Sequence, residues 1–195
     1  ATLAFAVAGW LIGASIIDVK KRQGKGKVRA RASAFAAALA HAGLGVTLMG
    51  VAGTTAWRSE ALEVMGPGQT MQVGPYTLRF DGVTRVNGPN YIADQGRIAL
   101  MDGKDVKAML RPEQRFYTAE NQSVSDTAIR TTVLRDLYVA LGDDRGKGRF
   151  AIRAYVSPLA PLIWLGALVM ALGGMLSLFG RLRVRAGAAE AQATE

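Results

Sequence analysis

The sequence contains no cysteine and a single histidine, His41, among its 195 residues. Without a thiol the chain can form no disulfide, iron–sulfur cluster or covalent haem attachment motif of its own, and it has no cysteine nucleophile. One imidazole excludes multi-histidine metal sites, and a serine triad would have to use His41. The chain can therefore supply at most one histidine ligand to any metal.

Acidic residues are also scarce, with 15 Asp and Glu against 24 Lys and Arg, which gives a formal net charge of +9. Such an excess usually suggests a nucleic-acid partner, but the position of the charge matters more than its sum. Residues 18–31 carry seven basic residues and one acidic residue, whereas residues 57–157 carry fourteen and twelve. Because the basic cluster lies between two apolar stretches, we interpret it as a topology signal and exclude nucleic acid as a partner.

Charge is missing altogether from three long stretches, residues 1–17, 34–56 and 158–180. A membrane-spanning helix needs about 20 apolar residues, and the second and third stretches meet that length. Residues 1–17 are apolar from the first position and are followed by basic residues instead of a small-residue cleavage site, so they do not resemble a signal peptide. We expect three transmembrane helices, the first truncated at its start, in the C-terminal portion of a longer membrane protein.

Lysine and arginine in short loops set the orientation of such helices, because the basic loops stay on the cytoplasmic side. Basic residues crowd residues 18–33 and also follow the last span in residues 181–195. This pattern predicts a basic cytoplasmic loop, a cytoplasmic tail without regular structure after Arg185, and a periplasmic position for residues 57–157. Trp57 and Trp164 lie at the expected outer ends of their spans, where interfacial indoles are common. The basic loop would also attract anionic lipid headgroups.

Residues 57–157 show the alternation of apolar and polar residues that is typical of half-buried strands. Turn signals separate the candidate strands, including Gly74-Pro75, Asn87-Gly88, Asp102-Gly103 and a glycine-rich loop over residues 142–148. We expect seven to nine short antiparallel strands in a small barrel or sandwich. The predicted fold class is a membrane protein that combines transmembrane α-helices with an all-β periplasmic domain. The alternating apolar positions are Tyr76, Leu78, Phe80, Val106, Ala108, Leu110, Phe150, Ile152 and Ala154.

The motifs of soluble enzymes are missing from this domain. The glycine-rich residues 142–148 lack the Ser or Thr and the spacing of a phosphate-binding loop. Asp143-Asp144 is expected to be a solvated turn, and Arg111, Glu113 and Arg115 are expected to form an exposed ion-pair cluster, with a docking role as the alternative. We therefore expect no catalytic residue within these 195 residues.

His41 stands apart because it lies about ten residues, or about 15 Å of helix, beyond Arg31 and thus in the cytoplasmic half of the second span. A polar ring there is costly and usually faces a partner. One interpretation is an axial haem ligand, with Gly45 one turn later leaving the same face clear for the macrocycle. The other is an interhelical hydrogen bond, with the small residues between Gly43 and Thr54 serving close helix packing. The acceptor for the second ring nitrogen would be either a backbone carbonyl or a group on a missing helix.

Several segments together resemble the C-terminal part of CcmF, the haem lyase family of the bacterial System I cytochrome c maturation pathway. The most specific is DLYVALGD, residues 136–143, followed by the Pro, Trp and double-Gly pattern of the last span. Phe150 departs from the Trp found in many relatives, but both are large apolar residues. The resemblance covers residues 40–56, 111–117, 129–143 and 154–179.

This resemblance implies a multispan protein of the bacterial inner membrane that takes haem from the chaperone CcmE and attaches it, as substrate, to apocytochrome c in the periplasm. It also implies a structural haem b held between two transmembrane histidines, of which His41 corresponds to the second and Gly45 to the clearance beside it. The other ligand and the haem-handling segment would lie upstream, so the fragment is not expected to be active by itself.

The β-domain is then expected to dock apocytochrome c or the thiol-handling partner CcmH, and Arg111, Arg115 and Tyr117 are the candidate docking residues. Two alternatives stay open. A paralogous haem lyase for nitrite reductase maturation would have much the same signature. A non-catalytic membrane scaffold would use the β-domain to bind a partner, and its His41 would only pack.

Overall fold

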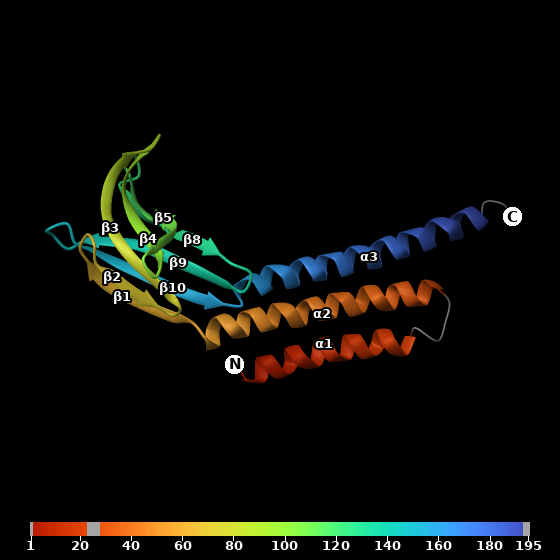
Figure 1. Cartoon of the computed structure of the whole chain (residues 1–195). Helices are drawn as coiled ribbons and strands as arrows, with labels where there is room; N and C mark the ends of the chain where they lie inside the picture. The colour runs from red at the N-terminus through yellow and green to blue at the C-terminus, as the bar shows by residue number, and fades with distance from the viewer. Residues whose placement is uncertain (1, 23–27, 193–195) are drawn as a thin grey trace. The chain divides into compact units, whose positions relative to one another are not determined.

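The computed structural model describes residues 2–22 and 28–192 (Figure 1). Within these residues the chain forms three helices and ten strands. It divides into two compact units: the three helices make up one, and Trp57–Pro158 make up the other. The helical unit is thus assembled from both sides of the β unit in the sequence.

The helices are α1 (Thr2–Arg22), α2 (Val28–Ala56) and α3 (Ala160–Gln192). Each is long and apolar enough to cross a membrane, with candidate spans at Thr2–Lys21, Ser33–Ala56 and Ala160–Gly180. In a bilayer a helix satisfies every backbone hydrogen bond internally, which is why charge-free runs of this length fold as helices. The fold class predicted for this part of the chain is confirmed.

The helices extend past the predicted spans. Residues 18–22 of the predicted basic loop 18–33 belong to α1 and residues 28–33 belong to α2, while residues 23–27 lie outside the described residues. Helix α3 continues to Gln192, so the expectation that the chain after Arg185 lacks regular structure is wrong as far as that residue. Ala, Glu and Gln, which make up residues 186–192 apart from one glycine, favour helix.

The β unit contains ten strands, more than the seven to nine expected from the sequence. The additional strands are short and polar, so the alternation of apolar residues did not indicate them. The strands are β1 (Ser59–Met65), β2 (Thr70–Val73), β3 (Tyr76–Asn87), β4 (Tyr91–Asp102), β5 (Asp105–Leu110), β6 (Glu113–Tyr117), β7 (Gln122–Asp126), β8 (Ala128–Thr131), β9 (Arg135–Asp144) and β10 (Phe150–Pro158).

Two antiparallel sheets pack into a sandwich. The four-stranded sheet has the order β1-β10-β9-β8. The six-stranded sheet has the order β2-β3-β4-β6-β7, and β5 pairs with β4 at the end of that strand not taken by β6. Of the two architectures expected from sequence, the sandwich is the one observed.

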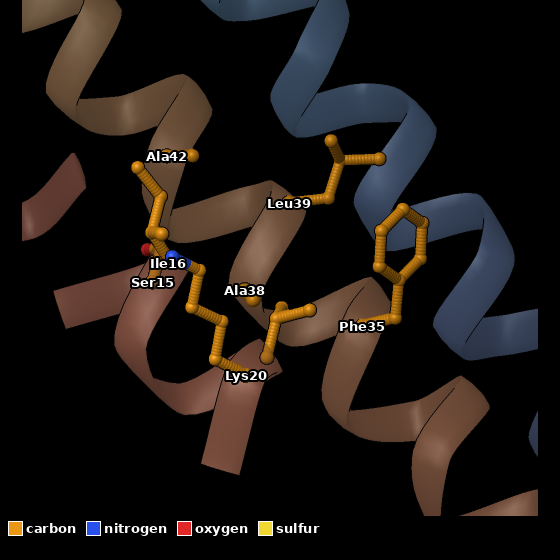
Figure 2. Close-up of a pocket in the computed structure, with 8 residues that line it drawn as sticks. Ser15, Ile16, Lys20, Phe35, Ala38, Leu39 and Ala42 are labelled. Carbon is orange, nitrogen blue, oxygen red and sulfur yellow. The ribbon is translucent and has the colours of Figure 1, made fainter. Parts of the chain in front are cut away.

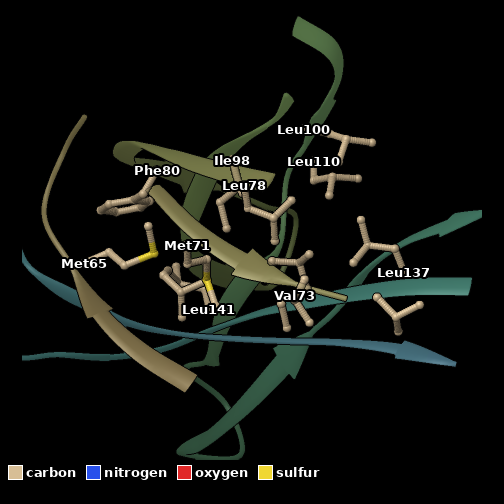
Figure 3. Packing of buried hydrophobic residues seen from close by; sticks show 14 residues of the cluster. Met65, Met71, Val73, Leu78, Phe80, Ile98, Leu100, Leu110, Leu137 and Leu141 are labelled. Atoms are coloured by element: carbon tan, nitrogen blue, oxygen red, sulfur yellow. The ribbon is translucent and has the colours of Figure 1, made fainter. Parts of the chain in front are cut away.

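The core lies between the sheets and is built largely from the alternating residues that the sequence singles out, but Val106 is 47% exposed and lies outside it. In the six-stranded sheet Leu78 pairs with Leu100 and Phe80 with Ile98, and all four are buried. The facing sheet contributes residues such as Leu137 and Leu141, and Figure 3 shows the two sets interdigitating. Burial of these side chains is the main driving force for folding of the domain.

Most of the predicted turns are observed. Gly74, at φ +53°, lies in the β2–β3 turn, and Gly103, at φ +61°, lies in the β4–β5 turn, both in the left-handed region that favours glycine. The glycine-rich turn is shorter than expected, because β9 continues through Gly142 to Asp144 and the turn is closed by the amide of Arg145 donating to the carbonyl of Arg149 at 2.8 Å.

Candidate functional site

Helix α2 packs against both α1 and α3, and small residues set how closely. A Cβ atom added to Gly43 would lie 2.6 Å from the backbone nitrogen of Met170 and 2.7 Å from the carbonyl oxygen of Gly166. One added to Gly50 would lie 2.8 Å from the backbone nitrogen of Ile163. These glycines therefore allow backbone-to-backbone packing of α2 on α3, as small residues do between membrane helices.

Gly45 faces the other neighbour. A Cβ atom at this position would lie 2.8 Å from Cγ1 of Ile12 and 3.0 Å from the carbonyl oxygen of Ala8, both in α1. Among the described residues, the space beside Gly45 is therefore occupied by α1. That Gly45 makes room for a haem stays a prediction. In the alternative, in which the small residues serve helix packing, the partner of Gly45 is α1.

His41 is exposed on α2, and its Nδ1 atom lies 2.7 Å from the carbonyl oxygen of Ala37, one turn earlier. A carbonyl oxygen can only accept a hydrogen bond, so Nδ1 carries the proton in this pair. In a neutral imidazole the other nitrogen, Nε2, then keeps its lone pair. The backbone carbonyl is one of the two acceptors considered from sequence, and this tautomer is the one that a metal-binding Nε2 requires.

The surroundings of His41 on α2 are apolar and open. Leu44, three residues later on the same helix, is 40% exposed. No cluster of three or more histidine and acidic residues that could hold a metal occurs among the described residues. A metal bound at His41 would thus find no set of three such ligands in the described part of the chain.

A cavity of about 320 Å³ lies between α1 and α2, and Figure 2 shows the residues that line it. The lining is apolar apart from the hydroxyl of Ser15 and the ammonium group of Lys20, and the Ser15 hydroxyl is satisfied by donating to the carbonyl of Leu11 at 2.7 Å. Neither His41 nor Gly45 lines it. The cavity is therefore separate from the candidate ligand.

In the β unit, Arg115 lies within an ionic network, and its role in docking stays a prediction. Its Nε donates to Glu113 at 2.8 Å, its guanidinium also pairs with Asp126, and its Cζ lies 4.8 Å from the ring centroid of Tyr91. Gln95 donates to the other carboxylate oxygen of Glu113 at 2.7 Å. The hydrogen bond from Arg115, followed by that from Gln95, lowers the pKa of Glu113.

The other two docking candidates differ from each other. Tyr117 is half-buried and packs its ring against Tyr91, with centroids 5.5 Å apart. Arg111 is exposed next to the buried Pro112. The ion-pair cluster expected from Arg111, Glu113 and Arg115 thus forms, among the described residues, between Glu113 and Arg115 with Asp126, and without Arg111.

A polar pair that the sequence interpretation missed lies in β9. Asp136 is 5% exposed, its Oδ2 accepts a hydrogen bond from the Tyr138 hydroxyl at 3.3 Å, and its Oδ1 has no hydrogen-bond partner in the described part of the chain. Burial, and then the charge of Asp136, raises the pKa of Tyr138. The Tyr138 ring stacks on Tyr155 at 4.7 Å, and Arg58 covers the Tyr155 ring at 4.2 Å. An acidic residue at the start of an apolar strand was the signal in the sequence.

The Asp143-Asp144 pair behaves as the expected turn. Oδ1 of Asp144 accepts a hydrogen bond from the amide of Gly146 at 2.7 Å, and the Asp143 side chain is 77% exposed. Asp144 thus stabilises the β9–β10 turn, as aspartate commonly does.

Comparison with known proteins identifies a related family. The family model described as the CcmF C-terminal beta-sandwich matches residues 56–158, slightly more than half of the chain. The cytochrome c-type biogenesis protein CycK of Rhizobium meliloti is 42% identical over 149 residues, which is 76% of this chain and 22% of that protein.

Two further relatives have similar sequence identities to this chain. The cytochrome c-type biogenesis protein CcmF of Haemophilus influenzae is 40% identical over 142 residues, covering 73% of this chain and 22% of that protein. The probable cytochrome c-type biogenesis protein NrfE of Escherichia coli is 34% identical over 138 residues, covering 71% and 25%. The chain thus matches about a quarter or less of the length of each of these relatives.

A solved structure described as the cytochrome c haem lyase CcmF has a TM-score of 0.72 to this chain at 17% sequence identity, covering 87% of this chain and 28% of that one. At this identity the likeness concerns the fold, and it includes most of both units.

Proposed function

The chain belongs to the CcmF family of cytochrome c-type biogenesis proteins, and from this premise we propose that it forms the C-terminal part of a haem lyase. The substrates of the whole protein would be haem and apocytochrome c. The 195 residues would contribute one haem b ligand and a partner-binding β-domain, while the haem-handling groups and the second ligand would come from upstream sequence. The fragment would therefore be inactive by itself.

The single observation that carries the ligand assignment is the hydrogen bond between Nδ1 of His41 and the carbonyl of Ala37. It makes Nδ1 the donor and holds the ring in one orientation, and in a neutral imidazole this tautomer leaves the Nε2 lone pair available to a metal. The apolar residues on either side of His41 on α2 suit a macrocycle in a low-dielectric environment. When bound, the haem b would supply single electrons to the haem substrate.

We further propose that the protein lies in the bacterial inner membrane with Trp57–Pro158 in the periplasm. The basic residues of residues 18–33 and those near the end of α3 support this orientation, because positively charged segments remain cytoplasmic. Trp57 and Trp164, 57% and 74% exposed, fit the interfacial positions expected of indoles.

The partners would be the haem chaperone CcmE, CcmH and other maturation subunits, and apocytochrome c. We assign docking of apocytochrome c or CcmH to the β-domain, where Arg111 is the candidate whose side chain is exposed. Arg115 and Tyr117 would stabilise this docking surface through their contacts with Glu113 and Tyr91.

Two alternatives remain. The match to NrfE supports a lyase that serves nitrite reductase maturation, which would use the same ligand and fold. In the scaffold alternative, His41 would bind no haem and the β-domain would only hold a partner. The close packing of Gly43 and Gly45 against neighbouring helices is what favours this second alternative.

The test is the haem content of the full-length protein that contains this chain. In the His41→Ala variant we expect the b-type signal of the reduced-minus-oxidised spectrum and of the pyridine haemochrome to be lost, at a normal level of membrane insertion. Val51→Ala is the matched control, since Val51 is exposed ten residues, or about 15 Å, further along the same helix and has no ligand atom. An unchanged spectrum in His41→Ala would leave the scaffold alternative.

A further inference from the structure

The turn between β8 and β9 has apolar residues where a solvent-exposed turn normally has polar residues, glycine or proline. Its central residues are Val133, which is 87% exposed, and Leu134, which is 52% exposed. The other turns of the domain use Pro67-Gly68, Gly74-Pro75 and Asp102-Gly103, the residue types that turns favour for conformational reasons. An exposed β-branched residue beside an exposed leucine therefore needs a reason outside the domain's own folding.

The backbone of this turn gives no such reason. The amide and the side-chain hydroxyl of Thr132 both donate to the carbonyl oxygen of Arg135, each at 2.8 Å, and these bonds close the turn without help from the two apolar side chains. Val133 and Leu134 lie at the apex of a hairpin that is already complete.

The strand register shows which end of the four-stranded sheet carries this apex. Arg135, directly after Leu134, pairs with Pro158, the last residue of β10. In the same sheet Ser59, the first residue of β1, pairs with Val156. The turn is thus at the end of the sheet where the chain arrives from α2 and leaves for α3.

The distances along the chain at this end are short. Helix α2 ends at Ala56, three residues before β1, and α3 begins at Ala160, two residues after β10. Val133 and Leu134 directly precede Arg135, so they lie beyond the last pair that β9 makes with β10. Both connections that leave this end of the domain for the helices are therefore only a few residues long.

We propose that Val133 and Leu134 insert into the lipid bilayer at its interface and anchor the β-domain to the membrane surface. The occupant of this apolar apex is lipid, because the two chain ends that leave this end of the domain enter helices able to span a membrane. Arg130 and Arg135 flank the turn, and their guanidinium groups suit lipid phosphates. The anchor rests on the membrane-spanning helices and does not depend on haem binding at His41.

The experiment uses a thiol label, since the chain has no cysteine and a single introduced one is labelled uniquely. The Val133→Cys variant is labelled with an environment-sensitive fluorophore. The labelled chain is then reconstituted into vesicles of phosphatidylethanolamine and phosphatidylglycerol. Because Val133 is so exposed, this substitution leaves folding intact, which protease resistance of the domain checks. Arg145→Cys is the matched control, as Arg145 is exposed in the β9–β10 turn at the opposite end of the same sheet.

We expect the emission maximum of the label at position 133 to shift to shorter wavelength in vesicles, and its fluorescence to be quenched by lipids that carry a nitroxide near the headgroup. The label at position 145 should be quenched only by aqueous iodide. Quenching at 133 by iodide alone, as at 145, would overturn the proposal. Shielding of the 133 label from both quenchers would also overturn it, because the apex would then contact protein.

Discussion

A Cβ atom placed on Gly166 in α3 would lie 2.5 Å from the carbonyl oxygen of Gly43 in α2. Carbon and oxygen atoms that are not bonded cannot approach so closely, so both positions exclude any side chain at this helix separation. Further along the same contact, a Cβ on Gly173 would lie 2.7 Å from the backbone nitrogen of Ala40. The position of His41 on α2 is thus set by backbone-to-backbone contact in its immediate neighbourhood.

Gly166→Val is expected to separate α2 from α3 at a cost of about 1–3 kcal/mol, typical of overpacking. Gly174→Val is the matched control, because a Cβ at Gly174 meets nothing within 4 Å among the described residues. The measurement is thermal unfolding of the detergent-solubilised protein. Equal melting temperatures for the two variants would show that close α2–α3 contact does not stabilise the helical unit.

Tyr138→Phe is expected to destabilise the β-domain by about 1–3 kcal/mol, because the buried carboxylate of Asp136 loses a hydrogen-bond donor. Tyr155→Phe is the control, since the stacked ring is retained and the structure records no hydrogen bond of the Tyr155 hydroxyl within the described residues. Chemical unfolding followed by circular dichroism gives the difference. If both variants lose the same free energy, the loss comes from removing a hydroxyl from the stacked pair and not from the hydrogen bond to Asp136.

The sequence predicted the helices and the sandwich because both follow from short-range patterns. Charge-free runs are long enough to span a membrane, and alternation at Leu78 and Phe80 marks the strand that faces the core. Strand β7 was missed because Gln122–Asp126 is exposed along its whole length and shows no apolar alternation. That strand supplies Asp126, so the full environment of Arg115 could not be predicted either.

The candidate ligand site was also predictable from short-range sequence patterns but not in its long-range contacts. His41 was recognisable as an isolated imidazole in a span, and a carbonyl one turn earlier is always within reach in a helix. The neighbours of Gly45 were not recognisable, because pairing of α1 with α2 is a long-range contact that glycine spacing does not encode. The spacing fits a helix partner and a macrocycle equally well.

Gly45→Ala separates these two uses of the glycine in the full-length protein. A methyl group at this position would lie 2.8 Å from Cγ1 of Ile12, so we expect α1 to shift and stability to fall. Adding Ile12→Ala removes that contact and should restore part of the lost melting temperature. Haem content is measured in the same samples. Loss of haem in Gly45→Ala that Ile12→Ala fails to restore would contradict the packing role and support haem clearance.

The acid stability of the β-domain should depend on the Arg115–Glu113 pair. The pKa of Glu113 is lowered in the folded domain, chiefly by the hydrogen bond from Arg115, so the pair stabilises the domain above the unfolded pKa of about 4.3 and the stabilisation is lost as pH falls through the folded pKa. Arg115→Gln is expected to lower stability at pH 7 by on the order of 1 kcal/mol, a figure reduced by the partial exposure of the guanidinium.

The measurement is the unfolding free energy of both proteins between pH 7 and pH 3. The difference between wild type and Arg115→Gln should shrink below the unfolded pKa of glutamate, because protonation of Glu113 removes the same interaction. Arg111→Gln is the control, since its exposed side chain should leave stability unchanged and affect cytochrome c maturation if Arg111 docks a partner. A difference that stays constant down to pH 3 would mean that Arg115 stabilises the domain mainly through its contact with the ring of Tyr91.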